Sequence, residues 1–525
     1  MELLNSRKYL LILAFVEGAA VMAVELLGAK MSAVYFGNSL YVWTSVLMVT
    51  ISGLAIGYFI GGRLTQRFPS KKTLYIIFLI AALLVLIMPA WANIIMQHTM
   101  TSDYFEAAIQ STIFYLLPAM IAFGIIPPYV ISLLSKEVED AGSYTGLVYT
   151  SSTFGGVITC LLTGFYLIPT YGVKMSTYCV AISIILIPFF YFFKKNILIS
   201  VGILLASAFI ISNGINPPSQ SKNSHVKVLH KSDGLMGQIL IADDLKTQKR
   251  SLMINNISQS FMHIPSGRSQ WRYVHRVALY ASDKPAGSKV LICGIGGGNL
   301  INELLALGFV IDAVDIDVRM AEVATEFFGM PANTSVFEDD ARHYIRTCKK
   351  KYDMVILDMS AGENQPSNVY TVECFKEIQG ILNPDGVMFV HYQNVLEGEG
   401  AEAAKSIGKT IIESGLKVKL LNTDKIVDGI KADWTIHSEL MFYASISVPA
   451  FITKGFDRRN KFADPFNFPK KQGIFLEGYD FSDGILLTDD NPIMDVLHVP
   501  ALESTRQAAL KRLIPILLKE KVEII

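Results

Sequence analysis

The stretch Val290-Leu-Ile-Cys-Gly-Ile-Gly-Gly-Gly-Asn-Leu decides the fold class of the second half of this chain. A short apolar run enters a glycine-rich turn, and a helix-type sequence follows the turn. This order predicts a buried strand, a tight turn and a helix. Gly294, Gly296 and Gly298 would allow the tight turn and let a ligand approach the backbone at the N-terminus of the helix. We therefore expect these three glycines to bind a cofactor.

Acidic residues follow the later apolar runs at the spacing of a nucleoside site. Val310-Ile-Asp-Ala-Val-Asp predicts a second strand that ends in Asp315, which is placed to accept hydrogen bonds from both ribose hydroxyls. Asp339 follows a third run and could contact an adenine amino group. Tyr352-Asp-Met-Val-Ile-Leu-Asp predicts a fourth strand that ends in Asp358.

This order of glycine turn and acids favours an adenosyl-sulfonium ligand over a dinucleotide. A dinucleotide fold would place a pyrophosphate on the glycine turn and would not need acids after the later strands. The alternation of apolar strands and helices from Lys289 onward predicts a parallel sheet covered by helices, which is a Rossmann-like α/β domain. A doubly wound domain without any ligand is the remaining alternative.

The segment before this domain has two parts. A polar stretch with Gly214, Pro217 and Pro218 is typical of a linker. Short β-type runs between residues 226 and 260 then predict a small antiparallel sheet. We predict three domains: a multi-pass transmembrane domain over residues 1–215, a small β subdomain over 216–265 and the Rossmann-like domain over 266–525.

The first 215 residues have the composition of a membrane domain. Only 19 of the 92 charged residues of the 525-residue chain fall there. Apolar runs long enough, or nearly long enough, to cross a bilayer predict an all-α bundle of about seven helices in a cell (inner) membrane. The runs cover residues 8–29, 40–62, 73–95, 111–134, 144–168, 175–193 and 196–213. The first run lacks a small-residue cleavage site, so it is expected to be a retained span.

Glycines recur inside the second apolar run. Gly53, Gly57 and Gly61 stand at four-residue spacing, which places all three on one face of a helix. Small residues in such a row let two helix backbones approach closely. The pattern favours helix packing over a pore lining.

Two carboxylates lie within the first apolar run. Glu17 and Glu25 are eight residues apart and lie within about 80° on a helix, so one interior face could hold both. Carboxylates at membrane depth face a partner or a wet cavity. Two interpretations stay open: Glu25 pairs with Lys30 or Arg63 and locks the bundle, or the carboxylates line a path for a substrate or an ion.

The loops give conflicting evidence on topology. Residues 63–72 and 194–195 carry clusters of Lys and Arg, which predicts that these loops are cytoplasmic. Seven spans would then place the second half of the chain outside the cell, whereas adenosyl donors are cytosolic. We expect the second half to be cytoplasmic, and the region 175–213 therefore not to provide two clean spans.

The overall composition excludes several other classes of function. The net charge is zero and no basic stripe with interleaved aromatic residues occurs, so a nucleic-acid partner is not expected. The five Cys stand singly, without a CxxC pair or a Cys/His cluster. Neither a metal site nor a disulfide framework is therefore expected.

Several pieces of the second half resemble the spermidine synthase (polyamine aminopropyltransferase) family. They are Gly237-Gln238-Ile, Ile257-Ser-Gln259-Ser, Tyr273, the glycine turn, Val314-Asp-Ile-Asp, Asp339-Asp340, Ile356-Leu-Asp358, Val369-Tyr-Thr and Leu382-Asn-Pro-Asp-Gly. Leu487-Thr-Asp-Asp-Asn-Pro, Phe36-Gly-Asn-Ser, Gly53-Leu-Ala-Ile-Gly, Gly61-Gly-Arg-Leu and Thr163-Gly-Phe-Tyr-Leu-Ile-Pro are similar to segments of membrane-fused members. The resemblance covers nearly the whole chain.

The resemblance implies a donor and a division of labour among the residues. The donor would be decarboxylated S-adenosylmethionine or S-adenosylmethionine, and Gln238 would join the glycines, Asp315 and Asp339 in binding it. Gln259 and Tyr273 would line the acceptor side. Asp358 would take the proton of the attacking amine. The resemblance implies no metal. The oligomeric state stays open, and a homo-oligomer is one of the states considered.

The chain departs from the family pattern where the family binds the cationic amine. The glycine turn normally carries an Asp at the position of Gly297, and the family's Tyr-His/Gln-Glu becomes Tyr273-Val-His275. The Asp that commonly follows the catalytic Asp by three residues is Ala361. Each change removes a group that would bind an ammonium, which is costly to leave unpaired in a dry pocket.

Three hypotheses therefore stand. The first is a membrane-anchored aminopropyltransferase that acts on an amine such as putrescine. The second is a methyltransferase-like enzyme with a lipid-proximal substrate, and the third is a non-catalytic transport protein that senses the nucleoside. Residues 360–368 are polar with Gly and Pro, which predicts a lid over the site. His263, His275 and His391 are expected to be surface or packing residues.

Overall fold

The computed structural model describes residues 7–99, 104–135, 141–215, 224–360, 365–398, 400–423, 438–447, 474–476, 478–491, 493–522 and 524–525. The chain divides into two compact units. The first comprises Met1–Ser224, Lys231–Ile239 and Leu510–Ile525, and the second comprises His225–His230 and Leu240–Ala509. The segment 216–265, which the sequence predicts as a separate subdomain, is thus divided between the two units.

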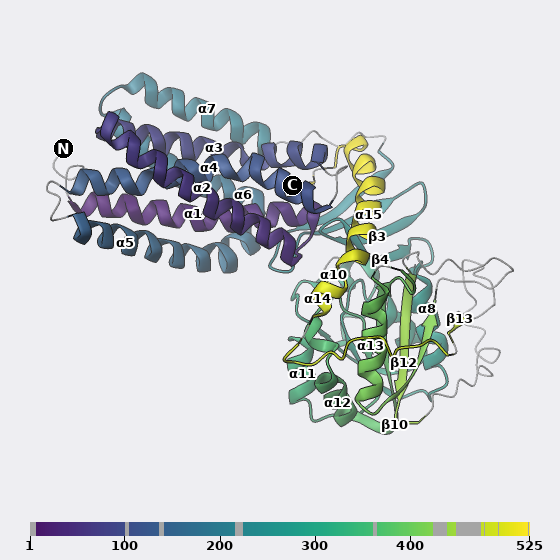
Figure 1. Ribbon diagram of the computed structural model, residues 1–525. Coiled ribbons are helices and arrows are strands. Elements are labelled where there is room, and N and C mark those ends of the chain that lie inside the picture. Colours follow the sequence, from purple (N-terminus) through teal and green to yellow (C-terminus); the bar gives the residue numbers. More distant parts are fainter. Residues whose placement is uncertain are drawn as a thin grey trace. The chain divides into compact units, whose positions relative to one another are not determined.

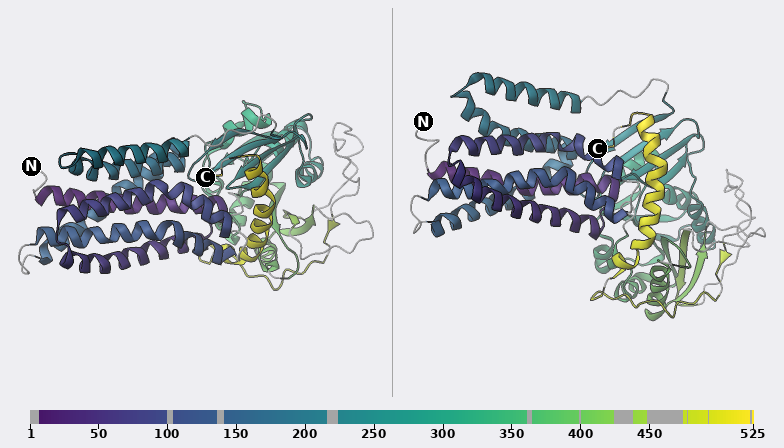
Figure 2. Two further views of the ribbon diagram at one scale, coloured as in Figure 1. Left: turned by 90° about the horizontal axis from the view of Figure 1, so that it is seen from above. Right: turned by 45° about the horizontal axis from the view of Figure 1, so that its top comes forward.

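Within the described part of residues 7–215, seven α-helices of the first unit lie side by side in a bundle (Figures 1 and 2). They are α1 (Arg7–Phe36), α2 (Leu40–Arg67), α3 (Lys71–Thr99), α4 (Tyr104–Leu134), α5 (Ala141–Leu162), α6 (Ile168–Phe193) and α7 (Ile197–Ile215), with a π-helical turn at Thr163–Leu167. Among the described residues, six segments are long and apolar enough to cross a membrane. The predicted all-α bundle is confirmed.

The glycine row of α2 packs against α4. A Cβ atom added at Gly53 would lie 2.6 Å from Met120 Cβ, and one at Gly57 would lie 2.4 Å from the carbonyl oxygen of Ile121. At Gly61 the carbonyl oxygen of Ile125 would be 2.9 Å away. A side chain at any of these positions would push the two helices apart, so the packing interpretation of the row is confirmed.

Glu17 is buried between α1 and α5, with 2% of its surface exposed. Its Oε2 accepts a hydrogen bond of 2.8 Å from Ser152 Oγ. The two helices approach closely there, because a Cβ at Gly18 would lie 2.0 Å from the carbonyl oxygen of Ser152. Lys30 and Arg63, the two cations considered as partners of Glu25, make other contacts. Lys30 Nζ donates to the carbonyl oxygen of Leu235, and Arg63 lies over the Phe59 ring.

The region 175–213 forms parts of two separate helices, α6 and α7. The expectation that it does not provide two clean membrane spans stays a prediction. The continuous segment Ala141–Phe193 is 53 residues long, or roughly 80 Å if straight, and it breaks at Gly172, where φ is 76°. The next helix, α7, begins cleanly because the Asn196 side chain accepts hydrogen bonds from the backbone N–H groups of Leu198 and Ile199.

The main sheet of the second unit has eight strands in the order β13-β11-β12-β10-β9-β6-β7-β8. The parallel strands are β6 (Lys289–Cys293), β7 (Val310–Asp315), β8 (Ser335–Glu338), β9 (Tyr352–Leu357) and β10 (Leu382–Asn394). The antiparallel edge is formed by β12 (Ser438–Ser445), β11 (Lys417–Asn422) and β13 (Ile474–Phe475). The predicted parallel sheet is confirmed, with this mixed edge added.

Helices connect and cover the strands of this sheet. They include α9 (Asn299–Ala306), α10 (Met320–Phe328), α11 (Ala341–Thr347), α12 (Val372–Ile381) and α13 (Ala401–Glu413), of which α12 and α13 lie over one face in Figure 1. Fully buried apolar residues such as Leu291, Val355 and Val390 form the core beneath them. The strand order reverses between β6 and β9, and ligands of open α/β sheets bind at the carboxyl ends of strands beside such a point.

A second sheet of five strands precedes the main one in sequence, in the order β1-β2-β3-β4-β5. The strands are β1 (Val226–Ser232), β2 (Ile239–Asp244), β3 (Lys249–Ile254), β4 (Ile257–His263) and β5 (Arg268–Ser269). Asn255 and Asn256 have φ values of 48° and 63°, which suits the tight turn between β3 and β4. The predicted small antiparallel sheet is confirmed.

Candidate active site

The glycine turn after β6 lies against the backbone of Asp358. The N–H of Gly294 donates to the carbonyl oxygen of Val314 at 2.8 Å, and Asp358 N–H donates to that of Cys293 at 2.8 Å. Gly294 has a φ of 96°, and a Cβ atom there would lie 2.0 Å from the carbonyl oxygen of Asp358. Only glycine fits this position, so the ends of β6 and β9 meet without an intervening side chain.

The rest of the turn leads directly into α9. Gly298 is the N-cap residue of this helix and has a left-handed backbone, with a φ of 70°. The N–H of Gly297 donates to Ser260 Oγ at 2.9 Å, and a Cβ at Gly297 would lie 2.9 Å from Ser260 Cβ. Ser260 therefore occupies the space that a side chain at position 297 would need.

Asp315 stands at the end of β7, beside the glycine turn. Its Oδ2 accepts a hydrogen bond of 2.8 Å from Ile295 N–H, and its Oδ1 accepts one of 2.9 Å from Asp317 N–H. Burial raises the pKa of Asp315 to about 6, although these two hydrogen bonds favour the ionised form. Each carboxylate oxygen has a second lone pair, so the group can still accept hydrogen bonds from a diol.

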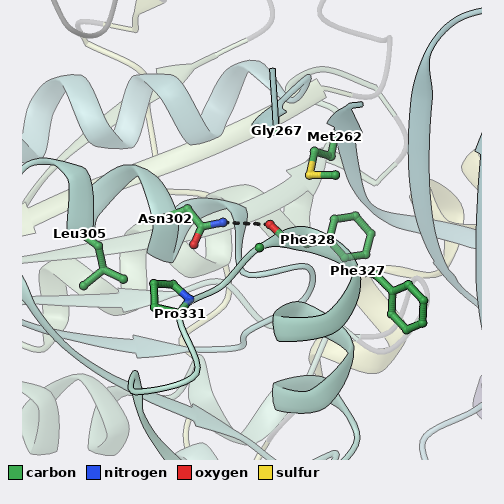
Figure 3. A pocket seen from close by; sticks show the side chains of 8 residues that line it. Met262, Gly267, Asn302, Leu305, Phe327, Phe328 and Pro331 are labelled. Carbon is green, nitrogen blue, oxygen red and sulfur yellow. Dashed lines mark hydrogen bonds between the residues drawn. The ribbon is translucent and has the colours of Figure 1, made fainter. Parts of the chain in front are cut away.

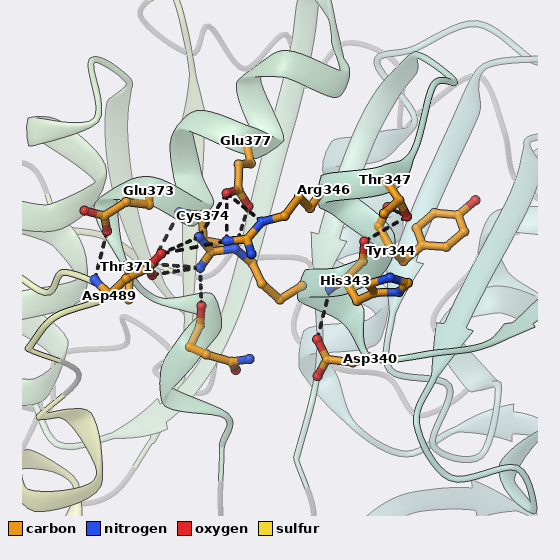
Figure 4. Close-up of polar contacts among 12 residues, drawn as sticks. Asp340, His343, Tyr344, Arg346, Thr347, Thr371, Glu373, Cys374, Glu377 and Asp489 are labelled. Atoms are coloured by element: carbon orange, nitrogen blue, oxygen red, sulfur yellow. Dashed lines mark hydrogen bonds and ion pairs between the residues drawn. The ribbon is translucent and has the colours of Figure 1, made fainter.

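Asp339 lies at the end of β8, as predicted. His343 Nδ1 in the following helix lies 2.8 Å from Asp339 Oδ2, within hydrogen-bonding distance. Its neighbour Asp340 caps α11, because Asp340 Oδ1 accepts a hydrogen bond of 3.0 Å from His343 N–H (Figure 4). The contact of Asp339 with adenine stays a prediction.

A buried arginine, Arg342, joins α11 to later segments, and no sequence motif pointed to it. Figure 4 labels its partners Thr371, Glu377 and Asp489. Arg342 pairs with Glu377 of α12 at 2.5 Å and with Asp489 at 3.0 Å. Its Nη1 also donates to the carbonyl oxygen of Asn368 and to Thr371 Oγ1. The motif that contains Asp489 therefore holds the end of the segment 365–371 in place.

Tyr273 and Asp358 meet at the carboxyl edge of the sheet. Tyr273 lies in α8 (Arg272–Ala281), and its hydroxyl donates to Asp358 Oδ2 at 3.0 Å. Burial and the neighbouring carboxylate raise the pKa of Tyr273 well above its usual value, so the hydroxyl remains protonated. The structure thus brings together two residues that the sequence predicts on the acceptor side.

His391 belongs to the same cluster and is not the surface or packing residue that the sequence suggested. Its Nδ1 lies 2.7 Å from Asp358 Oδ1, and its Nε2 lies 2.5 Å from Glu439 Oε2. The imidazole ring stacks on the Tyr273 ring, with centroids 3.9 Å apart and planes at 10°. Although burial opposes it, the carboxylates of Asp358 and Glu439 raise the pKa of His391 to about 10.

The register of two strands brings Glu439 into this cluster. Gln393 of β10 stands directly opposite Glu439 of β12 in the antiparallel pair, and Gln393 Nε2 donates to Glu439 Oε1 at 2.8 Å. His391 is two residues before Gln393 and therefore shares its face of the sheet. No local sequence motif predicts the role of Glu439, because its contact with His391 depends on the pairing of β10 with β12.

Gln259 and Gln238 have different positions. Gln259 Oε1 accepts a hydrogen bond of 2.5 Å from Ser360 Oγ, two residues after Asp358, which fits its predicted place on the acceptor side. Gln238 lies in the first unit, where its Nε2 donates to Asp233 Oδ1 at 3.1 Å. Its predicted contact with a cofactor stays a prediction. Residues 361–364 of the predicted lid, including Ala361, lie outside the described residues.

A comparison with protein families shows what part of the second unit is similar to. Residues 273–414 match the spermine/spermidine synthase domain. This region is therefore similar to that domain, and we call the second unit the synthase domain after this similarity. It contains the glycine turn, Asp315, Asp339, Tyr273 and Asp358, which are most of the residues that the sequence singled out.

Individual relatives match the synthase domain only in part. A polyamine aminopropyltransferase of Thermoplasma volcanium is 32% identical over 132 residues, which are 23% of this chain and 48% of that protein. An N-terminal histidine N-methyltransferase of Emericella nidulans is 29% identical over 112 residues, 20% of each chain. This chain spans less than half the length of these two relatives.

A solved structure was also found similar to the chain. The crystal structure of a probable spermidine synthase from Corynebacterium glutamicum matches with a TM-score of 0.37 at 17% identity. The match covers 42% of this chain and 81% of that one.

At two positions where the synthase domain departs from the family pattern, Gly297 and His275, the structure shows packing contacts. At Gly297 the space is filled by Ser260. His275 lies beside an ion pair of Arg268 and Glu303: its Nε2 is 2.8 Å from the carbonyl oxygen of Ser269, and its Nδ1 is 3.3 Å from Arg268 Nη2. His275 is thus a packing residue, as the sequence suggested.

The synthase domain also has an apolar cavity that none of the predicted site residues lines (Figure 3). Its volume is about 420 Å³, and it lies where α9 and α10 approach β4. Phe327, Phe328 and Leu305 line it, and Asn302 Nδ2 donates to the carbonyl oxygen of Phe328 at 3.1 Å.

Proposed function

We propose that this protein is a membrane-anchored polyamine aminopropyltransferase of the spermidine synthase type. It would transfer the aminopropyl group of decarboxylated S-adenosylmethionine to an amine such as putrescine. The observation that carries the proposal is the position of Asp358: within a matched synthase domain, this carboxylate lies against the glycine turn on one side and Tyr273 on the other.

The donor would lie along the carboxyl ends of β6, β7 and β8. The glycine turn leaves room for the nucleoside to approach the backbone at the start of α9. Asp315 would accept hydrogen bonds from the ribose hydroxyls, and Asp339 would accept one from the adenine amino group.

The transfer itself is an in-line displacement that needs alignment more than covalent help. The nitrogen lone pair of the acceptor forms a new N–C bond, the S–C bond breaks, and its electron pair stays on sulfur. The nitrogen then loses one proton, and Asp358 is placed to receive it. Gln259 and Tyr273 would hold the acceptor in line with the sulfonium.

One observation favours a second candidate, a methyltransferase-like enzyme with a membrane-proximal substrate. The family's acid for the aminopropyl ammonium is absent at Gly297, and Ser260 occupies its space. A donor site without that acid loses the group that distinguishes the ammonium of the decarboxylated donor. The similarity to a protein named a histidine N-methyltransferase points in the same direction.

A product assay tests the proposal against this alternative. The purified full-length protein is incubated with either donor and a panel of amines, and nucleoside and amine products are identified by mass spectrometry. The proposal predicts 5′-methylthioadenosine and an aminopropylated amine in equal amounts. S-adenosylhomocysteine would indicate methyl transfer instead. Binding of both donors without any product would indicate a protein that only senses the nucleoside.

The membrane half would anchor the enzyme in a cell (inner) membrane. Its six membrane-length segments support the anchoring. We propose that the synthase domain faces the cytoplasm, because both donors are cytosolic metabolites. A reporter that is active only in the cytoplasm, fused after Ile525, is expected to be active. An external signal would contradict the assignment of the donor, because the domain would then be separated from the donor supply.

A further inference from the structure

His391 links two carboxylates that lie on different strands. Asp358 follows β9, His391 is in β10, and Glu439 is in β12, so the linked groups come from three neighbouring strands. Both ring nitrogens are engaged, at 2.7 Å from Asp358 and 2.5 Å from Glu439. His391 and Glu439 are buried, with 6% and 9% of their surfaces exposed.

The double contact defines the protonation of the ring. A neutral imidazole carries one N–H and could donate to only one of the two carboxylates. When both carboxylates are ionised, both ring nitrogens have to donate, and the ring is then an imidazolium between two carboxylates. The pKa of about 10 for His391 agrees with this geometry. The three groups together then carry one net negative charge at neutral pH.

The groups that face His391 come from each element packed around it. Asp358 and Glu439 contribute the two carboxylates, and Tyr273 of α8 covers one face of the ring. Gln393 Nε2 donates a hydrogen bond to the other carboxylate oxygen of Glu439. Tyr370 also lies near Asp358, and burial together with the negative charge of Asp358 raises the pKa of Tyr370.

We propose that His391 and Glu439 are positioning residues of the transfer reaction, His391 by fixing the Asp358 carboxylate and Glu439 by keeping the cluster net negative. This inference rests on the proposed function and identifies how its acceptor side works. With the Asp358–His391 pair alone the cluster would be neutral. Glu439 restores one negative charge, which attracts an acceptor that carries an ammonium at its other end. The same charge allows the site to take up the proton that the neutral attacking amine releases.

The proton balance shows what each residue contributes. The acceptor nitrogen releases one proton as the N–C bond forms, and Asp358 receives it on a carboxylate oxygen. The net charge of the cluster changes from one negative to zero, and no buried positive charge remains uncompensated. Without Glu439 the same step would leave a net positive cluster in a buried place, which is costly.

Two variants should move the acid limb of the pH–rate profile in opposite directions. His391→Gln removes the cation and leaves two carboxylates, so the site holds a proton more tightly. The apparent pKa of the acid limb should therefore rise by about one unit. Glu439→Gln removes the second carboxylate, so the apparent pKa of the acid limb should fall by about one unit. KM for a cationic amine should increase about tenfold.

The matched control removes another buried histidine. His498→Gln leaves the cluster intact, because His498 contacts Tyr392 rather than Asp358, and it should leave the limb unchanged. A merely structural role of His391 and Glu439 would lower the rate equally at every pH. That result, or shifts of both variants in the same direction, would overturn the proposal.

A second measurement is independent of catalysis. Histidine labelled with ¹⁵N in the full-length protein in detergent should show one imidazolium signal that persists from pH 6 to pH 9 and disappears in His391→Gln. Titration of that signal near the usual pKa of histidine would overturn the inference about His391. A parent without transferase activity but with this imidazolium would contradict the proposed function and leave the charged cluster established.

Discussion

The donor side and the acceptor side of the site are built in different ways. On the donor side, contacts depend on backbone geometry: the left-handed Gly294 and Gly298, and Asp315 held by two backbone N–H groups. On the acceptor side, side chains contact side chains, as in the link from Tyr273 through Asp358 to His391. The first arrangement is set by local chain conformation and the second by long-range packing.

This difference shows where the chemistry of the domain can change. A backbone-based nucleoside site tolerates few substitutions, because most side chains are strained at a positive φ. The acceptor side can exchange partners while the sheet stays the same. Both sides depart from the family pattern: on the donor side Ser260 fills the space at Gly297 where the family carries an acid, and on the acceptor side Glu439 brings a carboxylate from another strand.

The largest effect is expected at Asp358. Asp358→Asn removes the proton acceptor but keeps the size of the side chain, so the transfer rate should fall by about 10²- to 10⁴-fold. Binding of 5′-methylthioadenosine should stay within about twofold of the parent. The rates are compared with those of Asp385→Asn, a change at an exposed carboxylate paired with Lys284. Equal losses of binding and rate in Asp358→Asn would break the separation of the two sides.

The next largest effect is expected at Asp315. Asp315→Ala leaves two ribose hydroxyls and two backbone N–H groups without their acceptor. Unmade hydrogen bonds of this kind cost about 1–3 kcal/mol, or about 5- to 150-fold in affinity for 5′-methylthioadenosine. Calorimetry measures the affinity, and thermal unfolding checks that the variant is folded. An affinity equal to that of the parent would show that the nucleoside lies elsewhere.

A pH dependence of binding should follow from the same residue. The nucleoside needs the ionised form of Asp315 as an acceptor, and burial raises the pKa of this group to about 6. As the pH falls below 6 the protonated fraction rises, so affinity should weaken by about tenfold between pH 7.5 and pH 5. Asp315→Asn has no such proton to gain and should show a nearly flat profile between these pH values.

The smallest effect concerns the choice of donor. Because Gly297 supplies no acid, we expect S-adenosylmethionine and its decarboxylated form to bind within about tenfold of each other, or roughly 1.4 kcal/mol. A hundredfold preference of the parent for the decarboxylated donor would show that another acid has taken over this role, and would exclude the methyltransferase alternative.

A substitution pair sharpens this prediction. Gly297→Asp alone should lower stability, because its Cβ would lie 2.9 Å from Ser260 Cβ. Ser260→Gly removes that obstacle, so the double variant should fold and shift its preference toward the decarboxylated donor. Ser260→Gly alone serves as the control, and it should leave the ratio of the two donor affinities unchanged.

The sequence predicted the donor side well because its features are local. A glycine turn after an apolar run and acids after later runs lie within single strand–turn–helix units, so Asp315 and Asp358 could be placed at one edge of a sheet. His391 and Glu439 could not be joined in this way, because their contact depends on the pairing of β10 with β12. Arg342 was missed for the same reason, since its partner Asp489 is 147 residues away.

The helical bundle shows the same limit of prediction for contacts between helices. Apolar length alone located the helices, and four-residue glycine spacing predicted a close helix contact that α4 provides. The partner of Glu17 could not be predicted, because Ser152 is one of many small polar residues in the bundle. The break at Gly172 was also missed, since a single glycine in an apolar run does not by itself mark a bend.

The central claim is that the donor side is an intact nucleoside site that works separately from the acceptor side. The most direct test is calorimetry of 5′-methylthioadenosine with the full-length parent, Asp315→Ala and Asp358→Asn under one condition. We predict that the parent and Asp358→Asn bind with affinities within about twofold, and that Asp315→Ala binds about 5- to 150-fold more weakly. A parent that does not bind the nucleoside, or an Asp315→Ala variant that binds as tightly as the parent, would contradict the claim.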